Sequence, residues 1–295
     1  MEHRLGIVGI GNMGEPITEN LHSAGFEVVT YDKRQEIARK MRAKGIKVAK
    51  TLKELSERSD IILDILPDTS ATREVLTKKE GLLEGMREPK VILDMTTSDP
   101  RESIELGKFL REKNIEYLDC PMTGGVIGAK TRGLVLMVGG NEKVFQRCKY
   151  ILDVIAKKIF YMGKLGNGHY MKLVHNQLSH STFLAACEAA TLGVGLGLPL
   201  DTMIEVFNFG NARSYATEVR FPRFILSGSY DAGASFKTMY KDIGLVMRKT
   251  EELNYNFPIT RATFDYWYYP VKHGQGDKDY TTIFNLIGQI CKNEG

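Results

Sequence analysis

Short apolar runs alternate with segments of helical spacing through the first half of the chain. Helical periodicity marks Asn12–Ala24, Gln35–Ala43 and Pro100–Lys113. Alternation of this kind predicts a mainly parallel sheet that is covered by helices on both faces. The strands that we expect are Leu5–Val8, Glu27–Tyr31, Ile61–Leu66, Lys90–Met95, Glu116–Leu118, Leu134–Val138 and Lys158–Tyr161.

The pattern changes after Gly163, because no further convincing strand follows. Long segments with helical spacing take over at Gly168–Gly195, Asp201–Phe207, Phe236–Leu253 and Ile259–His273. We therefore expect two domains. Residues 1–163 should form an α/β domain, and residues 164–295 should form an all-α domain.

The composition is that of an ordinary globular protein without an extreme charge. The chain has 295 residues, of which 43% are hydrophobic, so it can bury a substantial core. Lys and Arg number 40 against 36 Asp and Glu, which gives a net charge of +4. This charge is small and evenly spread, so we expect neither nucleic acid nor a membrane surface as a partner.

The chain shows no targeting or metal-binding pattern. No apolar run is long enough for a transmembrane helix, and the N-terminus lacks the features of a signal peptide. The four cysteines form no CxxC pair, which is typical of a reducing compartment, and we expect a cytoplasmic protein. The six histidines and the cysteines show no zinc spacing, so we expect no metal.

A glycine-rich loop follows the first predicted strand and leads into a helix. It reads Gly9-Ile10-Gly11-Asn12-Met13-Gly14. Gly9 permits a tight turn, Gly11 lets the backbone approach a pyrophosphate, and Gly14 lets the helix pack closely on the strand. The helix N-terminus offers free N–H groups and positive potential to the anion. The loop predicts a dinucleotide site in a Rossmann-type, doubly wound domain, although flavin or S-adenosylmethionine loops look similar.

Asp32 ends the second predicted strand, where an acidic residue meets the ribose hydroxyls of a dinucleotide. A carboxylate there binds the 2′-OH of NAD and repels the 2′-phosphate of NADP, so we expect NAD to be preferred. Lys33 and Arg34 come directly afterwards and can tolerate a phosphate, which leaves NADP open.

Three more residues stand at predicted strand ends, where ligands of parallel sheets bind. Leu66 and Pro67 should line the adenosine side of the cofactor. Thr96 should meet the cofactor near its ribose or nicotinamide.

Two further motifs carry candidate chemistry. Thr123-Gly124-Gly125 follows a predicted strand, and its backbone N–H groups and hydroxyl suit a carboxylate, with an ordinary turn as the alternative. Lys172 and Asn176 are one helical turn apart and share a face. An ammonium beside an amide can hold and protonate an oxygen, although most helical lysines are simply solvent-exposed.

Together, these motifs resemble the β-hydroxyacid dehydrogenase family, which includes 3-hydroxyisobutyrate dehydrogenase. The resemblance covers almost the whole chain. The family's N-terminal signature is matched from Gly9 to Pro16 and its substrate signature from Asp119 to Gly125, continuing to Gly140. Its catalytic signature is matched by Gly166, Gly168, Lys172 and Asn176, and a later pair is matched by Lys241 and Asp242.

The resemblance implies reversible hydride transfer between a nicotinamide cofactor and a small 3-hydroxy acid or its semialdehyde. It implies that Lys172 exchanges the hydroxyl proton and that Asn176 orients the substrate. Thr123, Gly124 and Gly125 would hold the substrate carboxylate. Lys241 would lie near the nicotinamide, and Asp242 would fix it by a charge pair. A homodimer or homotetramer is also implied.

Some features leave the substrate and the reaction open. Thr123 replaces the serine that is usual in the family, and Arg213 either reaches a second acidic group of the substrate or is a salt-bridged surface residue. Alternatives are an NADPH-dependent semialdehyde or glyoxylate reductase and an imine reductase of the same fold. Imine-reducing relatives replace the lysine, so Lys172 argues against that activity. A non-enzymatic nucleotide-binding module is a further alternative.

Overall fold

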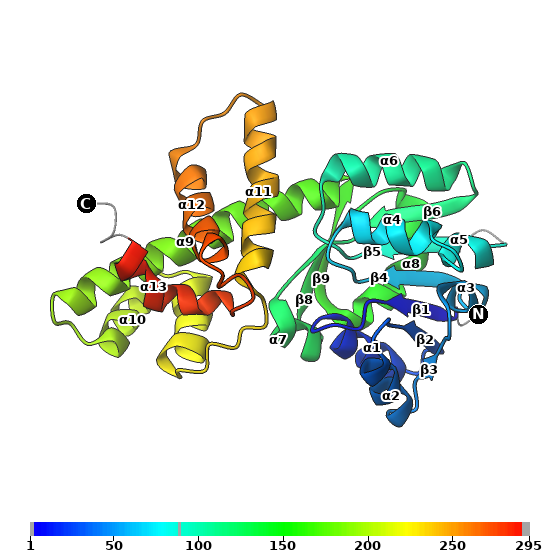
Figure 1. The fold of residues 1–295 in the computed structure, drawn as a ribbon, viewed down its shortest axis with the longest axis horizontal. Helices are drawn as coiled ribbons and strands as arrows, with labels where there is room; N and C mark the ends of the chain where they lie inside the picture. The colour runs from blue at the N-terminus through cyan, green and yellow to red at the C-terminus, as the bar shows by residue number, and fades with distance from the viewer. Residues whose placement is uncertain (1–2, 88–89, 291–295) are drawn as a thin grey trace. The chain divides into compact units, whose positions relative to one another are not determined.

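The computed structural model describes residues 3–87 and 90–290 and divides the chain into two compact units, Met1–Lys172 and Leu173–Gly295 (Figure 1). Each unit has its own hydrophobic core. No helix among these residues is long and apolar enough to cross a membrane.

The first unit is built on a sheet for which nine strands are described, in the order β3-β2-β1-β4-β5-β6-β8-β7, with β9 beside β8. The pairs from β3 to β6 are parallel, and β8 is antiparallel to β6 and β7. The strand order reverses between β1 and β4, and ligands of doubly wound sheets bind at the carboxyl ends of strands beside such a reversal. The strands are β1 (Leu5–Val8), β2 (Val28–Tyr31), β3 (Lys47–Val48), β4 (Ile61–Asp64), β5 (Lys90–Asp94), β6 (Ile115–Asp119), β7 (Met122–Thr123), β8 (Leu134–Gly139) and β9 (Ala156–Gly163).

Helices cover both faces of this sheet. Successive strand residues point to opposite sides, so a continuous apolar strand presents apolar side chains to both faces. Ile61 and Leu63 pack into one core cluster, and Ile62 packs into the other. The first cluster is closed by α1 (Gly14–Ser23), α2 (Gln35–Ala43), α7 (Gly125–Lys130) and α8 (Glu142–Ile155). The second cluster is closed by α3 (Leu52–Glu57), α4 (Thr69–Thr77), α5 (Leu82–Gly85) and α6 (Pro100–Arg111). Figure 1 shows α1 and α2 on one side of the sheet and α4 and α6 on the other.

The second unit is helical, and its core is aromatic. Phe183, Phe221, Phe236 and Trp267 are fully buried and pack ring against ring. The division between the units falls inside the long helix α9, after Lys172. The elements are α9 (Asn167–Gly195), α10 (Leu200–Phe209), the π-helix η1 (Ala216–Leu226), α11 (Phe236–Glu252), α12 (Pro258–Lys272), the 3-10 helix η2 (Tyr280–Thr282) and α13 (Ile283–Ile290).

The predicted fold class is confirmed, and each predicted strand and helix is found within a few residues of its expected bounds. The sequence analysis missed α8, although Asn141 stands before it as an N-cap. It also missed η1, where Pro222 interrupts ordinary helical spacing, and it named none of the elements β3, β7, α3, α4, α5, α7, η2 and α13. Of the four cysteines, Cys291 lies outside the described residues.

Candidate active site

The glycine loop has the backbone geometry that its sequence predicts. Gly9 has a φ of +91°, and a Cβ on Gly14 would lie 1.9 Å from the Gly9 carbonyl oxygen. Both positions therefore require glycine for packing. A Cβ on Gly11 would meet no atom within 4 Å. Gly11 faces open space, which leaves room for a ligand beside the N-terminus of α1.

Asp32 lies directly after β2 and ties the glycine loop to that strand. Its carboxylate accepts hydrogen bonds from the Ile10 N–H at 3.1 Å and from the Arg34 guanidinium at 2.7 and 2.9 Å. Burial alone would raise the pKa of Asp32, but the hydrogen bonds and charge of Arg34 and the Ile10 N–H outweigh burial and lower it. The carboxylate is therefore ionised at neutral pH.

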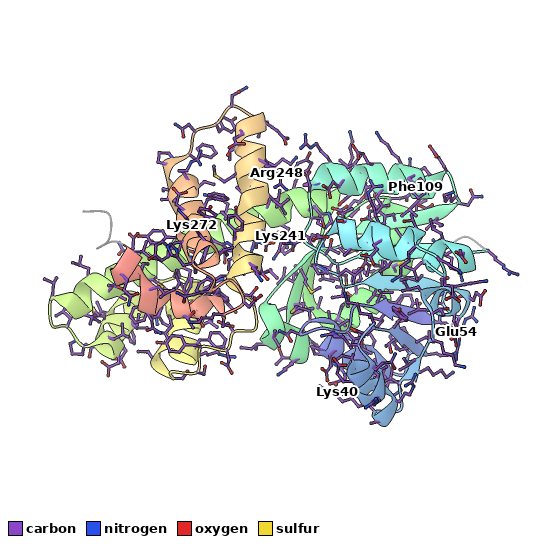
Figure 2. All side chains as sticks on the ribbon, in the orientation of Figure 1. Lys40, Glu54, Phe109, Lys241, Arg248 and Lys272 are labelled. Carbon is purple, nitrogen blue, oxygen red and sulfur yellow. The ribbon has the colours of Figure 1, made fainter. Side chains whose placement is uncertain are left out.

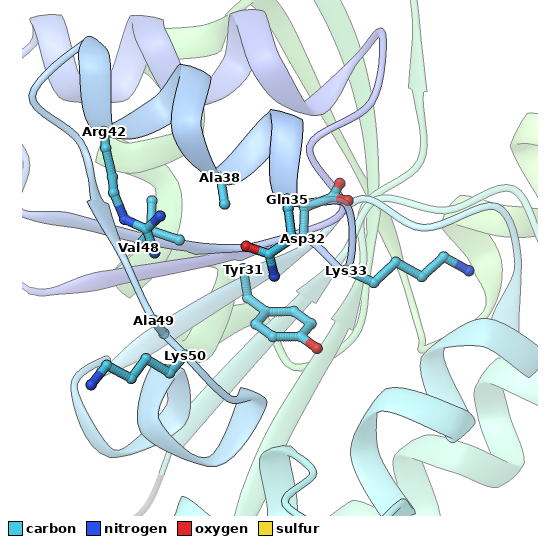
Figure 3. A pocket seen from close by; sticks show the side chains of 9 residues that line it. All are labelled: Tyr31, Asp32, Lys33, Gln35, Ala38, Arg42, Val48, Ala49 and Lys50. Carbon is cyan, nitrogen blue, oxygen red and sulfur yellow. The ribbon is translucent and has the colours of Figure 1, made fainter.

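A pocket opens beside Asp32, and its lining is rich in positive charge (Figure 3). Three cationic residues, Lys33, Arg42 and Lys50, line the pocket, whereas Asp32 is the one acidic residue of its described lining. Figure 3 shows the Lys33 amine extending away from Arg42 and Lys50. The full lining is Tyr31, Asp32, Lys33, Gln35, Ala38, Arg42, Val48, Ala49 and Lys50.

The other predicted cofactor contacts lie after β4 and β5. Leu66 is half-buried against the core cluster under α3–α6, and Pro67 is exposed. Thr96 is buried, and its N–H donates to the Asp94 carboxylate at 2.8 Å. The Thr96 hydroxyl shares a hydrogen bond with Ser98 at 2.7 Å.

Three buried aspartates end neighbouring strands, and the sequence analysis assigned none of them a role. Asp64, Asp94 and Asp119 are paired in register across β4, β5 and β6. Burial, followed by repulsion from Asp94, raises the pKa of Asp64 well above its usual value. Burial also raises the pKa of Asp119. In the described ranges, no group of three or more acidic, His or Cys side chains can hold a metal ion. The signal in the sequence was an aspartate closing each apolar strand.

Asp94 and Asp64 each accept a hydroxyl donor. Tyr117 donates to Asp94, and Thr72 donates to Asp64. Because these aspartates also hold backbone N–H groups two residues further on, they fix the turns that carry Thr96 and Leu66.

The Thr123–Gly125 segment contains two successive glycines with left-handed backbone. Gly124 has a φ of +118° and precedes α7, and Gly125 has a φ of +60°. A Cβ on Gly125 would meet no atom within 4 Å. Thr123 is half-buried in β7, where it pairs with Val135. Gly125 therefore lies beside open space, and left-handed glycines before a helix are a backbone geometry that can bind an anion.

Lys172 and Asn176 lie one turn apart on α9, and both are buried. The Asn176 amide donates to one oxygen of Asp242 at 2.8 Å. The other oxygen of Asp242 forms an ion pair with the Lys241 amine at 3.1 Å. Figure 2 shows Lys241 on α11. The structure therefore brings Lys241, Asp242 and Asn176 together, and the link between Asp242 and Asn176 was not predicted. Arg213 is exposed and pairs with Glu218 at 3.6 Å.

Known proteins resemble both units of the chain. A family model for the NAD-binding domain of 6-phosphogluconate dehydrogenase matches residues 4–163. A model for the NAD-binding of NADP-dependent 3-hydroxyisobutyrate dehydrogenase matches residues 166–287.

Individual relatives match over almost their whole length. The 2-(hydroxymethyl)glutarate dehydrogenase of Eubacterium barkeri is 31% identical and covers 97% of this chain and 95% of its own. The structure of Mycobacterium tuberculosis 3-hydroxyisobutyrate dehydrogenase with L-serine has a TM-score of 0.87 at 25% identity and covers 97% of this chain and 99% of its own. The V8 variant of an imine reductase from Myxococcus stipitatus, in complex with NAD+, shares the fold, with a TM-score of 0.66 at 17% identity over 97% of this chain and 100% of its own.

Proposed function

The chain belongs to the β-hydroxyacid dehydrogenase family, and from this membership we propose that it transfers a hydride between a nicotinamide cofactor and a small 3-hydroxy acid or its semialdehyde. The observation that carries the proposal is the buried Lys172 with Asn176 one turn further along α9. The chain thus combines a proton-exchanging amine with a Rossmann unit that suits a dinucleotide.

The glycine loop fits such a cofactor. Gly11 leaves space where a pyrophosphate would lie, and the N-terminus of α1 supplies positive potential. Leu66, Pro67 and Thr96 would line the cofactor at the strand ends, and Lys241 would lie near the nicotinamide. When bound, the nicotinamide supplies the hydride acceptor or donor.

The protein's own side chains handle the proton and the orientation of the substrate. In oxidation, the Lys172 amine accepts the proton of the substrate hydroxyl, and in reduction it returns the proton to the carbonyl oxygen. The N–H groups of Gly124 and Gly125 and the Thr123 hydroxyl hold the substrate carboxylate. Asn176, whose amide is itself oriented by Asp242, aligns the alcohol. This division of roles requires a carboxylate near the reacting hydroxyl, as in a 3-hydroxy acid.

We also propose that NAD is the preferred cofactor. Asp32 is ionised and lies where the adenosine ribose is bound in Rossmann units, so it favours a 2′-OH over a 2′-phosphate. The cations of the adjacent pocket act in the opposite direction and leave some activity with NADP.

A spectrophotometric screen at about 340 nm tests the reaction. It pairs NAD and NADP with 2-(hydroxymethyl)glutarate, 3-hydroxyisobutyrate, L-serine, glycerate and 4-hydroxybutyrate, and NADH and NADPH with semialdehydes, glyoxylate and a cyclic imine. We expect turnover with a 3-hydroxy acid. Reduction of the imine alone would replace the proposal with an imine reductase, and binding without turnover would indicate a non-enzymatic module.

Lys172→Ala tests the role of the amine. We expect kcat to fall by about 10²–10⁴-fold, because the variant lacks its proton acceptor. NADH binding, measured by fluorescence titration, should stay nearly unchanged. Lys164→Ala removes an exposed lysine just before α9 and serves as the matched control, with kcat within about twofold of wild type. A Lys172 variant that kept most of its kcat would refute the assignment.

We propose a homodimer or homotetramer in a reducing, cytoplasmic setting. Large apolar side chains are exposed along α9, α10 and the turn between them, and a second copy of the chain would cover them. The thiols of Cys120, Cys148 and Cys187 are free and buried, and burial raises the pKa of each. The exposed Val, Leu and Phe residues of this segment are Val174, Leu178, Leu192, Val194, Leu196, Leu198, Val206 and Phe209.

A further inference from the structure

We propose that Asp119 and His169 are positioning residues that fix the first turn of α9, and with it Lys172, against the strand ends of the first unit. The role rests on the proposed function of Lys172. It uses contacts within the first unit only, since Lys172 is the last residue of that unit.

Asp119 caps the start of α9 with both oxygens of its carboxylate. One oxygen accepts the Gly166 N–H at 2.9 Å, and the other accepts the His169 N–H at 2.8 Å. The first N–H groups of a helix have no partner within the helix, and their positive potential favours a negative charge. Because each oxygen is used by a different N–H group, the carboxylate fixes the orientation of the turn as well as its distance from β6.

Glycines enclose this carboxylate on two sides. A Cβ on Gly139 would lie 2.4 Å from one Asp119 oxygen, and a Cβ on Gly168 would lie 2.8 Å from the other. The Cβ on Gly168 would also lie 2.4 Å from the Met137 carbonyl oxygen. Only hydrogen atoms fit at both positions, so the start of α9 packs closely against the Asp119 carboxylate and the Met137 carbonyl.

The His169 side chain ties the same turn to β5 and α6. Its Nε2 lies 3.1 Å from the Thr96 carbonyl oxygen, which can only accept, so Nε2 carries the hydrogen and donates it. Its Nδ1 shares a hydrogen bond with the Ser103 hydroxyl at 2.9 Å. The ring is buried. His169 thus links α9 to the turn that carries Thr96, a proposed cofactor contact.

These two residues connect three parts of the proposed site. Asp119 ends β6 only four residues before Thr123, His169 holds the Thr96 turn, and Lys172 follows His169 by one helical turn. Reacting groups must be aligned closely, and a displacement of about 1 Å can cost about 10²-fold in rate. We call the contacts of Asp119 and His169 with the first turn of α9 the joint. The joint should therefore govern the rate of the chemical step and leave cofactor affinity nearly unchanged.

Asp119→Asn tests the joint, because an amide can accept at one atom only and loses at least one of the two N–H bonds. We expect faster amide hydrogen exchange, by about tenfold or more, in peptides that cover residues 164–172. We expect kcat to fall by about 10–100-fold, with the Kd of NADH within about twofold of wild type. The deuterium isotope effect on kcat should rise, measured with the panel hydroxy acid that wild type oxidises fastest.

Asn141→Ala is the matched control. Asn141 also caps a helix of the first unit, accepting the Lys143 and Val144 N–H groups at 2.9 and 3.4 Å, but α8 carries no proposed functional residue. We expect a loss of about 2 °C or more in Tm. Faster exchange should be confined to the start of α8, and kcat should be unchanged.

Two His169 variants keep the proposal testable if Asp119→Asn does not fold. His169→Gln retains a side-chain donor for the Thr96 carbonyl, whereas His169→Ala does not, so the glutamine variant should keep more of the wild-type kcat. Equal losses in both His169 variants, or an Asp119→Asn enzyme with unchanged kcat or with loosened NADH binding, would overturn the positioning role. If wild type oxidised no hydroxy acid of the panel, the proposed function would fail and the positioning role with it. Hydrogen exchange would still show separately whether the joint holds α9.

Discussion

A single carboxylate, Asp32, combines two tasks at the end of β2. It holds the glycine loop through the Ile10 N–H, and it binds Arg34, which in turn donates to the Ile10 carbonyl at 3.0 Å. Arg34 is therefore occupied as long as Asp32 is charged. We expect the choice between NAD and NADP to depend on whether this pair stays closed.

Asp32→Asn should shift the cofactor preference toward NADP. The variant removes the charge that repels a 2′-phosphate and weakens the hold on Arg34, which can then meet the phosphate. We expect the ratio of kcat/KM with NADP to that with NAD to rise by about tenfold or more. Asp60→Asn breaks a comparable arginine pair, with Arg4, just before β4 and should leave the ratio unchanged. A ratio that stayed constant in Asp32→Asn would show that Asp32 does not select the cofactor.

Strands and helices bring the buried acids together at the scale of the elements. The parallel register of β4 with β5 places Asp64 beside Asp94, and one oxygen of Asp64 is buried without a hydrogen-bond partner. In the unfolded chain this carboxyl titrates near its usual pKa of 3.8, whereas in the folded chain its pKa is well above that value. Between these two pKa values, the folded chain keeps the Asp64 proton that the unfolded chain has lost. The stability that this proton provides is complete below the unfolded pKa and is lost as the pH rises through the folded pKa.

Asp64→Asn should remove this loss, because an amide stays neutral at every pH and can donate to Asp94. We expect the variant to gain Tm relative to wild type, by about 2 °C or more, at about pH 9. The gain should shrink at about pH 4, close to the unfolded pKa, where the folded wild-type carboxyl keeps its proton and nearly all of this stability is present. Thermal unfolding of both proteins across the pH range measures the difference, and a pH-independent gap would contradict the expectation.

The two ends of α9 predict opposite results for the same substitution. Gly168→Ala places a Cβ against the Met137 carbonyl and Asp119, and we expect it to lose about 1–3 kcal/mol of stability, together with activity. Gly195→Ala, at the last residue of α9, places its Cβ within 4 Å of no atom. It should be neutral or stabilising by up to about 1 kcal/mol. Urea unfolding of both variants provides the measurement, and equal losses would count against the packing argument.

At the scale of the whole molecule, the exposed apolar side chains along α9, α10 and the turn between them should set the oligomeric state. Phe209 is 95% exposed and Leu196 is 71% exposed. The double variant Leu196→Glu/Phe209→Glu should therefore lower the assembly state, since it places charges where apolar contacts are expected. Light scattering after size exclusion measures the mass. Phe160→Glu, on β9 of the first unit, is the control and should not change it. A double variant of unchanged mass would place the interface elsewhere.

The alternation of apolar runs with helical spacing was sufficient to predict the fold, because short continuous apolar runs mark strands that are buried on both faces and helical spacing marks helices that bury one face. Local sequence was sufficient to find the glycine loop, Asp32 and the one-turn spacing of Lys172 and Asn176. Local sequence could not reveal the row of aspartates, since the register between distant strands decides which carboxyl groups meet. The link from Asn176 to Asp242 is likewise a contact between helices far apart in the chain. The functional roles of the site residues and the boundary at 163/164 stay predictions.

The enclosure of Asp119 has a consequence for how this sequence can vary. Gly139 and Gly168 are glycines because the Asp119 carboxylate and nearby backbone atoms fill the space that their side chains would occupy, and Gly166 has a φ of +91°. A descendant with a smaller neutral residue in place of Asp119 would lose the carboxylate, but the Lys164 carbonyl and the Gly168 N–H would still restrict Gly139, and the Met137 carbonyl would still restrict Gly168. We therefore expect homologues to keep glycine at positions 139 and 168 even where position 119 has changed.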